Sequence, residues 1–459
     1  MNIKRLNPQY IFVIVGLIYG IAFLITVPPF QIPDEYDHYY KALDISNGNI
    51  IPVKIGNNLA GVYVPKSAKI LTDSIYQKWA FFINNREKIG IYSLLNMHYN
   101  NDNTVFVDIS KFIVITYSPV PYLAAVLFMA LGKLFGLSPL ILLYLGRLGN
   151  LLLWLFIIYL AIKITPVFKW IFLAISLMPL TLFQAASLSA DSLTIALSFL
   201  TIAIFLKFSL DTNIKKIEKK HVLILILVSL LLGLTKLPYI LLFFMFFLIP
   251  ASKFRDKKRM LLIFGLISLL TLLLLGTWNL MTTGLYMTIN PGVSVKGQLF
   301  FVLLHPFNFI QILANTLFTY NLGMLPSIIV GVWGWSEMPL PYWVYIIYII
   351  ALFIMAFLDK SSTKIIPLQK YAILGLFLSI TLIIFLIEYI TWTFVGAPIV
   401  NGIQSRYFIP IFPLLFLILY RKGSNNKNRI LIESMITVFI ISILSVVVLA
   451  FINQYVVYF

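Results

Sequence analysis

Long runs of apolar residues, separated by short polar or charged segments, recur along the chain from Tyr10 to Tyr455. An apolar helix of about 20 residues is long enough to cross a bilayer, and the longer runs reach that length. We expect eleven crossings: Tyr10–Val27, Leu140–Ile162, Trp170–Ala186, Ser189–Leu206, Val222–Leu234, Leu237–Pro250, Met260–Leu280, Trp343–Leu358, Tyr371–Trp392, Tyr407–Tyr420 and Ile430–Phe451. No alternating pattern that would build a membrane barrel is visible.

Three further apolar segments leave the number of crossings open. Tyr117–Phe135 is long enough to span, but a crossing there would invert every later loop, so we expect it at the outer interface or re-entering. Phe300–Phe318 and Leu325–Trp335 would add a pair of crossings if both insert. The sequence therefore predicts an all-α polytopic membrane protein with about 11–13 transmembrane helices.

The composition supports a membrane protein and excludes several other classes. Hydrophobic residues make up 61% of the chain and charged residues 11%, with a mean hydropathy of +0.96. The absence of cysteine excludes disulfides, thiolate metal sites and a cysteine nucleophile. The net charge of +18 does not indicate nucleic-acid binding, because the basic residues lie in short loops between apolar runs.

These basic loops predict the orientation of the protein. Six clusters hold 21 of the 34 Lys and Arg residues, and the positive-inside rule places all six in the cytoplasm: Lys4–Arg5, Lys163–Lys169, Lys207–Lys220, Lys253–Arg259, Lys360–Lys370 and Arg421–Arg429. No small-residue cleavage site follows the first apolar run, so we expect a retained helix with a cytoplasmic N-terminus. The protein is expected to be a multi-pass protein of the cell membrane, with its first loop outside.

The chain is interpreted as a single integral-membrane domain over residues 1–459, with two notable outer segments. The first loop, residues 28–111, holds eight of the 16 acidic residues and is long enough to be functional. The second, residues 281–340, is expected to be an outer loop with a re-entrant segment. The first loop is the more informative, because its acids begin directly after the first crossing.

The start of this loop, "VPPFQIPDEYDHYYKALDISNG", has the signals of a helix. Pro33 suits the first helical position, Asp34 and Glu35 fall in the first turn, and Gly48 is suited to end the helix. Spacing of i, i+4 and i+7 places Asp34, His38 and Lys41 on one face. Two interpretations stay open: the acids only cap a surface helix, or they belong to a site that needs partners from elsewhere.

Five ionisable residues lie inside or at the rim of apolar runs, where each costs roughly 2.5–3.5 kcal/mol on insertion. The predicted topology places all five on the same side as Asp34: Arg147, Asp191, Lys236, Glu388 and Arg406. The cations suit a phosphate or pyrophosphate, and the carboxylates suit a general base or a divalent ion. The alternatives are snorkelling to headgroups for Arg147, Lys236 and Arg406, helix capping for Asp191, and a bond to a neighbouring helix for Glu388.

These segments together resemble a known family. "FQIPDEYDHYYKALDISNG" resembles the signature of a bacterial polytopic membrane family of unknown function, which is similar to the GT-C superfamily of lipid-dependent glycosyltransferases. The blocks "GRLGNLLLW", "LMPLTLFQAASLSADS", "LTKLPY", "GVWGW" and "IQSRYFIPIFP" follow in the same order. Ser405 stands where glycine is more usual. The resemblance implies a GT-C-like helical body with a large extracytoplasmic first loop.

The resemblance also implies a function. A membrane glycosyltransferase would move a sugar from a polyprenyl-phosphate donor to an envelope glycan, a glycolipid or a protein on the outer face. Asp34 would be the general base, with Glu35 and His38 as further catalytic residues, and Asp191 would be a second acid. The donor phosphate would meet Arg147, Lys236 and Arg406. Asp34 and Asp191 could hold a divalent cation, Mg or Mn. The rivals are a transporter or flippase of lipid-linked saccharides and a non-catalytic envelope-assembly subunit.

Overall fold

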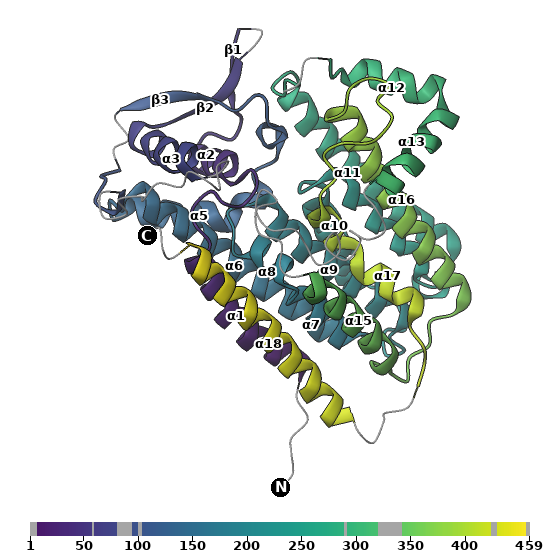
Figure 1. The fold of residues 1–459 in the computed structure, drawn as a ribbon. Coiled ribbons are helices and arrows are strands. Elements are labelled where there is room, and N and C mark those ends of the chain that lie inside the picture. Colours follow the sequence, from purple (N-terminus) through teal and green to yellow (C-terminus); the bar gives the residue numbers. More distant parts are fainter. Residues whose placement is uncertain are drawn as a thin grey trace.

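A computed structural model describes residues 7–56, 59–79, 94–99, 103–288, 292–319, 342–423 and 429–455, and helices dominate it (Figure 1). Six helices in this part of the chain are long and apolar enough to cross a membrane: α1 (Pro8–Thr26), α6 (Pro139–Ile164), α9 (Ala190–Leu210), α11 (Lys257–Thr282), α16 (Pro367–Thr391) and α18 (Arg429–Tyr455). The predicted all-α polytopic membrane protein is confirmed.

The other five expected crossings fall on shorter elements, so the full-length helices of the described residues are fewer than the expected 11–13. Prolines explain much of this, because each removes a backbone donor and ends or starts a helix. Pro179 separates the two short helices of one crossing, and Pro238 and Pro410 lie at the starts of two others. The elements are α7 (Lys169–Ser176), α8 (Pro179–Ala185), α10 (Lys219–Gly233), η4 (Leu237–Leu248), α15 (Tyr342–Leu358), η7 (Ser405–Tyr407), η8 (Ile409–Ile411) and α17 (Phe412–Leu419).

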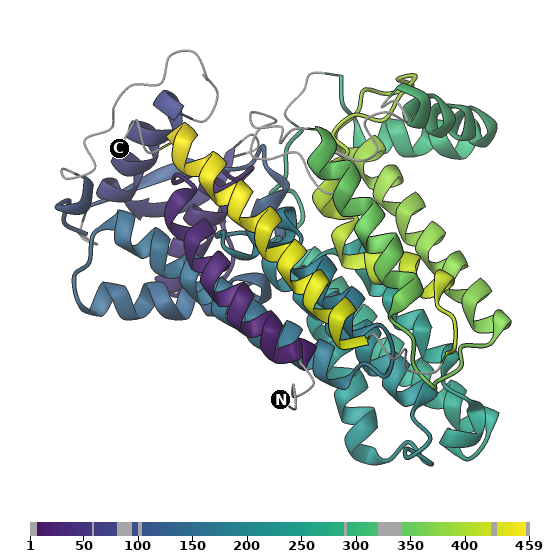
Figure 2. The ribbon, with the colours of Figure 1, turned by 60° about the horizontal axis from the view of Figure 1, so that its bottom comes forward.

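The core is built around α6 and α9, whose side chains are mostly buried. The two ends of the chain meet against this core, where α18 runs beside α1 (Figure 2). The Tyr19 and Ser445 hydroxyl oxygens lie 2.6 Å apart, and the rings of Phe23 and Phe451 lie 5.5 Å apart. The last helix thus closes the bundle against the first.

The segment Tyr117–Phe135, which was expected not to cross the membrane, forms η3 (Val120–Tyr122) and α5 (Leu123–Leu134). The helix α5 is short and apolar and packs against α6. Gly149 of α6 allows this close contact, since a Cβ there would lie 2.6 Å from the carbonyl oxygen of Ala124. Twelve residues of helix extend about 18 Å, less than the roughly 30 Å hydrocarbon core. The helix α5 is therefore too short to cross alone, which agrees with the expected interfacial or re-entrant segment.

The first loop folds into a small layer over one end of the bundle (Figure 1). It contains α2 (Glu35–Ser46), α3 (Lys66–Trp79) and an antiparallel sheet of β1 (Val53–Ile55), β2 (Leu59–Pro65) and β3 (Thr104–Asp108) in the order β1-β2-β3; η2 (Ile113–Thr116) follows directly after the loop. The sheet was not predicted. Its strands are three to seven residues long, and β3 pairs with β2 across about 40 residues of chain, so no local pattern announces it.

The second outer segment contains a sharply bent pair of helices, α12 (Val295–Leu304) and α13 (Pro306–Thr319), which meet at 107°. Pro306 begins α13 and so prevents one continuous helix. Counted as one broken span or re-entrant loop, the pair raises the number of membrane-spanning units to seven among the described residues. Leu325–Trp335, which was expected to insert together with Phe300–Phe318, lies outside the described residues.

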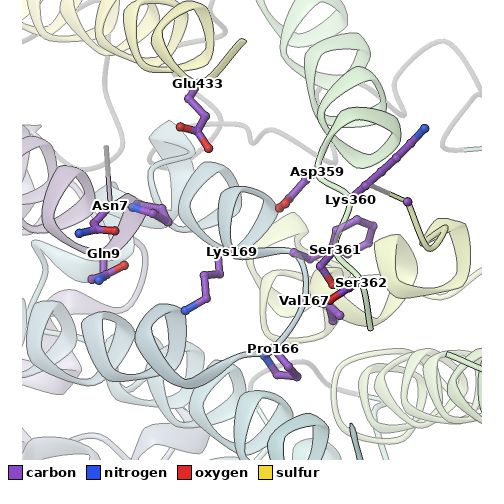
Figure 3. Close-up of a pocket in the computed structure, with 13 residues that line it drawn as sticks. Asn7, Gln9, Pro166, Val167, Lys169, Asp359, Lys360, Ser361, Ser362 and Glu433 are labelled. Atoms are coloured by element: carbon purple, nitrogen blue, oxygen red, sulfur yellow. The ribbon is translucent and has the colours of Figure 1, made fainter. Parts of the chain in front are cut away.

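The described basic clusters gather at the end of the bundle opposite the first loop. Lys253 of η5 (Ala251–Phe254) donates to the Phe208 carbonyl at 2.8 Å, and Lys370 donates to the Tyr420 carbonyl. A pocket of about 430 Å³ opens at this end near Asn7 and Lys169 (Figure 3). Two carboxylates line this pocket. Asp359 accepts a hydrogen bond from the Trp170 backbone amide at 2.9 Å, and Glu433 accepts one from the Trp170 indole at 3.1 Å, so both carboxylates join helix ends.

Candidate functional site

Asp34 lies near the start of the first loop, directly before α2, and its side chain makes no cap hydrogen bond with that helix. It is the N-cap of α2 with φ of 65°, a left-handed conformation that aspartate tolerates better than most residues. Its carbonyl accepts hydrogen bonds from the Asp37 and His38 amides, both at 3.1 Å. The helix therefore begins at Glu35, two residues after Pro33, and Asp34 stands just outside it.

Four ionisable side chains from distant parts of the chain meet here, and we call Asp34, Asp191, Lys236 and Arg406 the charge cluster. Arg406 Nη2 donates to Asp34 Oδ2 at 2.6 Å, and Arg406 Nη1 lies 3.5 Å from Asp191 Oδ2. Lys236 Nζ donates to Asp191 Oδ1. Arg406 thus bridges the two acids, and Asp191 bridges the two cations.

Asp191, Lys236 and Arg406 each lie at or just before the start of a helical segment. Asp191 lies in the first turn of α9, where the Ser189 hydroxyl accepts from its amide at 3.1 Å and the helix dipole favours a negative charge. Lys236 directly precedes η4, and Arg406 lies in η7. The Tyr239 hydroxyl donates to the Tyr407 carbonyl at 2.7 Å and so ties η4 to η7.

Two tyrosines complete the cluster, and the sequence analysis did not single them out. The Lys236 ammonium lies 5.7 Å from the Tyr117 ring centre and 5.3 Å from that of Tyr407, and Arg406 lies 5.5 Å from the latter. Aromatic faces attract cations at these distances. Tyrosines are frequent in this chain, so only the "SRYFIP" context of Tyr407 hinted at a role.

Arg406 retains an unused donor. Its side chain is 5% exposed, yet its Nε has no hydrogen-bond partner among the described residues. An unsatisfied buried donor is costly, by about 1–3 kcal/mol. An anion that reached Arg406 would satisfy this donor, which makes the guanidinium the best-prepared anion-binding group of the cluster.

Glu35 and Arg147 do not join the charge cluster, although both were expected in the site. They form a fully buried ion pair, with Arg147 Nε 2.8 Å and Nη2 2.5 Å from the Glu35 carboxylate. The other guanidinium donors bind the carbonyls of Leu24, Val27 and Pro28. All five N–H groups of Arg147 are occupied, so none is left for a donor phosphate.

The carboxylate oxygens of Glu35 also accept hydrogen bonds from the backbone. Its carboxylate accepts from the Phe30 amide at 2.9 Å and from the Leu188 amide at 3.0 Å. The pair therefore joins the end of α1, the start of α2, helix α6 and the loop before Asp191. The hydrogen-bonding groups of Glu35 and Arg147 are thus used within the protein, and neither residue has one left for a substrate.

His38 and Lys41, which were expected on one face of α2 with Asp34, bind partners outside the charge cluster. His38 is buried, and its Nδ1 lies 2.7 Å from the Tyr122 hydroxyl. Burial lowers the pKa of His38 to about 3, although the nearby Asp34 opposes the shift, so the imidazole is neutral. Lys41 is also buried and reaches the Ile115 carbonyl at 3.4 Å; burial lowers its pKa to about 8.

Glu388 lies at the edge of the charge cluster. It is the single acid of α16 and lies in the last turn of that helix, within electrostatic range of Asp34, Lys236 and Arg406. Its carboxylate has no hydrogen bond or ion pair with the residues that the structure describes. The bond to a neighbouring helix, which was one expectation for this residue, is not present among the described residues.

A divalent ion does not fit the acids as they stand. Asp34 and Asp191, the expected ligands, both face Arg406, so a guanidinium already supplies positive charge between them. Within the described ranges no three His, Asp or Glu side chains are grouped to hold a metal ion. We therefore derive no step through a metal.

The fold and the charge cluster define a polytopic helical membrane protein with an ionic site at the end that carries the first loop. Residues 17–415 match a family of predicted membrane proteins (DUF2142), and the chain belongs to that family. Comparisons with curated proteins and with solved structures found no match.

Proposed function

We propose that this protein is a membrane glycosyltransferase. It would move a sugar from a polyprenyl-phosphate donor to an envelope glycan, a glycolipid or a protein on the extracytoplasmic face of the cell membrane. The observation that carries the proposal is the charge cluster, because two cations and two carboxylates from four separate segments meet at the end of the bundle that carries the first loop. The resemblance of these segments to the GT-C superfamily supports the same chemistry.

Asp34 is the member best suited to act as general base. Its side chain is 28% exposed, whereas that of Asp191 is 4% exposed, so an acceptor hydroxyl can reach Asp34 more easily. Its backbone conformation also holds the carboxylate outside the α2 hydrogen-bond pattern. Asp34 would take the hydroxyl proton while the acceptor oxygen forms a bond to the anomeric carbon.

The bond from the anomeric carbon to the phosphate oxygen breaks in the same step, and the phosphate leaves with the electron pair. Arg406 and Lys236 would stabilise the charge that develops on this phosphate. A single displacement of this kind inverts the anomeric centre. No other reactant is needed, since the lipid phosphate is itself the leaving group.

The ion pairs suggest how the donor prepares the base. The two acids of the charge cluster neutralise its two cations, and Arg406 holds Asp34 at 2.6 Å. A donor phosphate that binds the free Nε of Arg406 competes with Asp34 for the same guanidinium. Donor binding would thereby loosen the Asp34 contact and free an oxygen for the acceptor proton, which couples base activation to the presence of the donor.

The location argues for a lipid-linked donor. By the positive-inside rule the basic end faces the cytoplasm, so the charge cluster faces outward. Nucleotide sugars are cytoplasmic, so an outward site needs a donor that has already crossed the membrane. A polyprenyl-phosphate sugar meets this need, since its tail remains in the bilayer while its phosphate reaches Lys236 and Arg406.

The test is a set of variants scored for surface-glycan composition by mass spectrometry at matched protein levels. Asp34→Asn and Asp191→Asn are expected to remove one specific sugar from one envelope component. Asp73→Asn serves as the control, because Asp73 pairs with Lys69 on the exposed face of α3. An unchanged profile in both variants, with normal expression, would reject catalysis by the cluster and return transport or scaffolding as the explanation.

A further inference from the structure

A carboxylate and an indole ring lie side by side at the end of α16, with the carboxylate within electrostatic range of the charge cluster. Trp392 is the C-cap of this helix, one turn beyond Glu388. A Cβ on Gly402 would lie 2.6 Å from Trp392 Cδ1 and 2.8 Å from Glu388 Oε2, so the backbone at Gly402 packs against both groups. The positive φ of Gly402, 85°, suits a residue without a side chain at this turn.

Both groups are available to a ligand. Trp392 is 39% exposed, and Glu388 is half-buried. The Glu388 carboxylate receives no hydrogen bond from the residues that the structure describes, although a partly buried carboxylate is stabilised by donors. A partly exposed indole ring and an unused acceptor therefore lie together at the end of α16.

We propose that Glu388 and Trp392 bind the sugar ring that is transferred, an inference that rests on the proposed function. A saccharide presents hydroxyl donors at its edge, which a carboxylate accepts, and C–H groups on its faces, which pack on an aromatic ring. The ring of the donor is bonded directly to the phosphate. Once Lys236 and Arg406 hold that phosphate, the ring lies within one sugar's length of them, where Glu388 lies within electrostatic range of both cations.

Four variants test this subsite in cells that lack the native protein, with the transferred sugar measured by mass spectrometry. Trp392→Ala is expected to lower incorporation roughly tenfold, and Trp392→Phe to retain most of it, because phenylalanine keeps an aromatic face. Glu388→Gln is expected to lower incorporation severalfold. Trp343→Ala, which removes another exposed tryptophan on α15, is the control and is expected to behave like the wild type.

A binding measurement separates recognition from folding. Purified protein is titrated with D-glucose, D-galactose, D-mannose and N-acetylglucosamine, and the tryptophan emission of the wild type is compared with that of Trp392→Phe. One sugar is expected to change the emission of the wild type but not that of Trp392→Phe. If no sugar does so, the subsite is wrong. Should Trp392→Ala fail to fold, Trp392→Phe and Glu388→Gln carry the test.

The outcomes also distinguish this inference from the proposed function. If Asp34→Asn abolishes transfer while Trp392→Ala and Glu388→Gln retain it, the transferase stands and the subsite is rejected. If Asp34→Asn also leaves the glycan unchanged, the proposed function fails first. If Trp392→Ala moves the same amount of sugar to a different acceptor, the subsite binds the acceptor, and its assignment to the donor ring is overturned.

Discussion

The buried pair of Glu35 and Arg147 offers the sharpest test of how the site is supported. Both side chains are 0% exposed, and the pair makes two charge-assisted hydrogen bonds. Replacing Glu35 by glutamine leaves the guanidinium charge uncompensated in this location. Removing one partner of a buried pair costs about 3–5 kcal/mol, a large share of a total stability of roughly 5–15 kcal/mol.

Arg147→Met has a further cost, because the guanidinium also binds the carbonyls of Leu24, Val27 and Pro28. Each buried carbonyl that loses its donor adds about 1–3 kcal/mol. We therefore expect Arg147→Met to be the more damaging single variant. The double variant Glu35→Gln with Arg147→Met should recover part of the charge cost, since no unpaired charge remains.

Thermal unfolding of detergent-purified protein, followed by size-exclusion chromatography, measures these effects. Lys69→Met is the matched control, because it breaks an exposed pair with Asp73 that contributes about 0–1 kcal/mol. The reasoning is refuted if Arg147→Met melts like the wild type. If such a stable variant also lost sugar transfer, Arg147 would act on the donor phosphate, as the sequence alone had suggested.

Arg406→Lys keeps the charge but loses the planar fork, so we expect at least a roughly tenfold loss of sugar incorporation at normal protein levels. His38 has a folded pKa of about 3 and an ordinary value of 6.5, so its contribution to stability is present above pH 6.5 and is lost by about 1.4 kcal/mol per unit as pH falls toward 3; melting curves of His38→Gln should depend less on pH in this window. Gly149→Ala should lower the melting temperature, because the added Cβ would lie 2.6 Å from the Ala124 carbonyl oxygen; normal melting would contradict that packing.

The sequence alone determined the class of protein and the general position of the ionisable residues. Apolar runs at bilayer length and basic loops predict a helical membrane bundle, because each helix satisfies its own backbone within the lipid. Asp191, Lys236 and Arg406 could be selected one by one, since a charge beside lipid needs a reason, and Asp34 stood out in the acidic start of the first loop. These are local properties, which a linear pattern records.

Only the tertiary structure decided which charges meet. Asp34 and Glu35 are neighbours in the chain and looked alike, yet Asp34 turns toward Arg406 from its left-handed N-cap, whereas Glu35 enters the helix and faces Arg147. Pairing partners of Asp34 and Glu35 lie more than 100 residues away in sequence. The small sheet and the shortened crossings also escaped prediction, because long-range strand pairing and proline breaks depend on what packs around them. A sequence pattern indicates that a charge will be buried at a cost in free energy. Which residue pairs with that charge and offsets the cost depends on how distant helices pack.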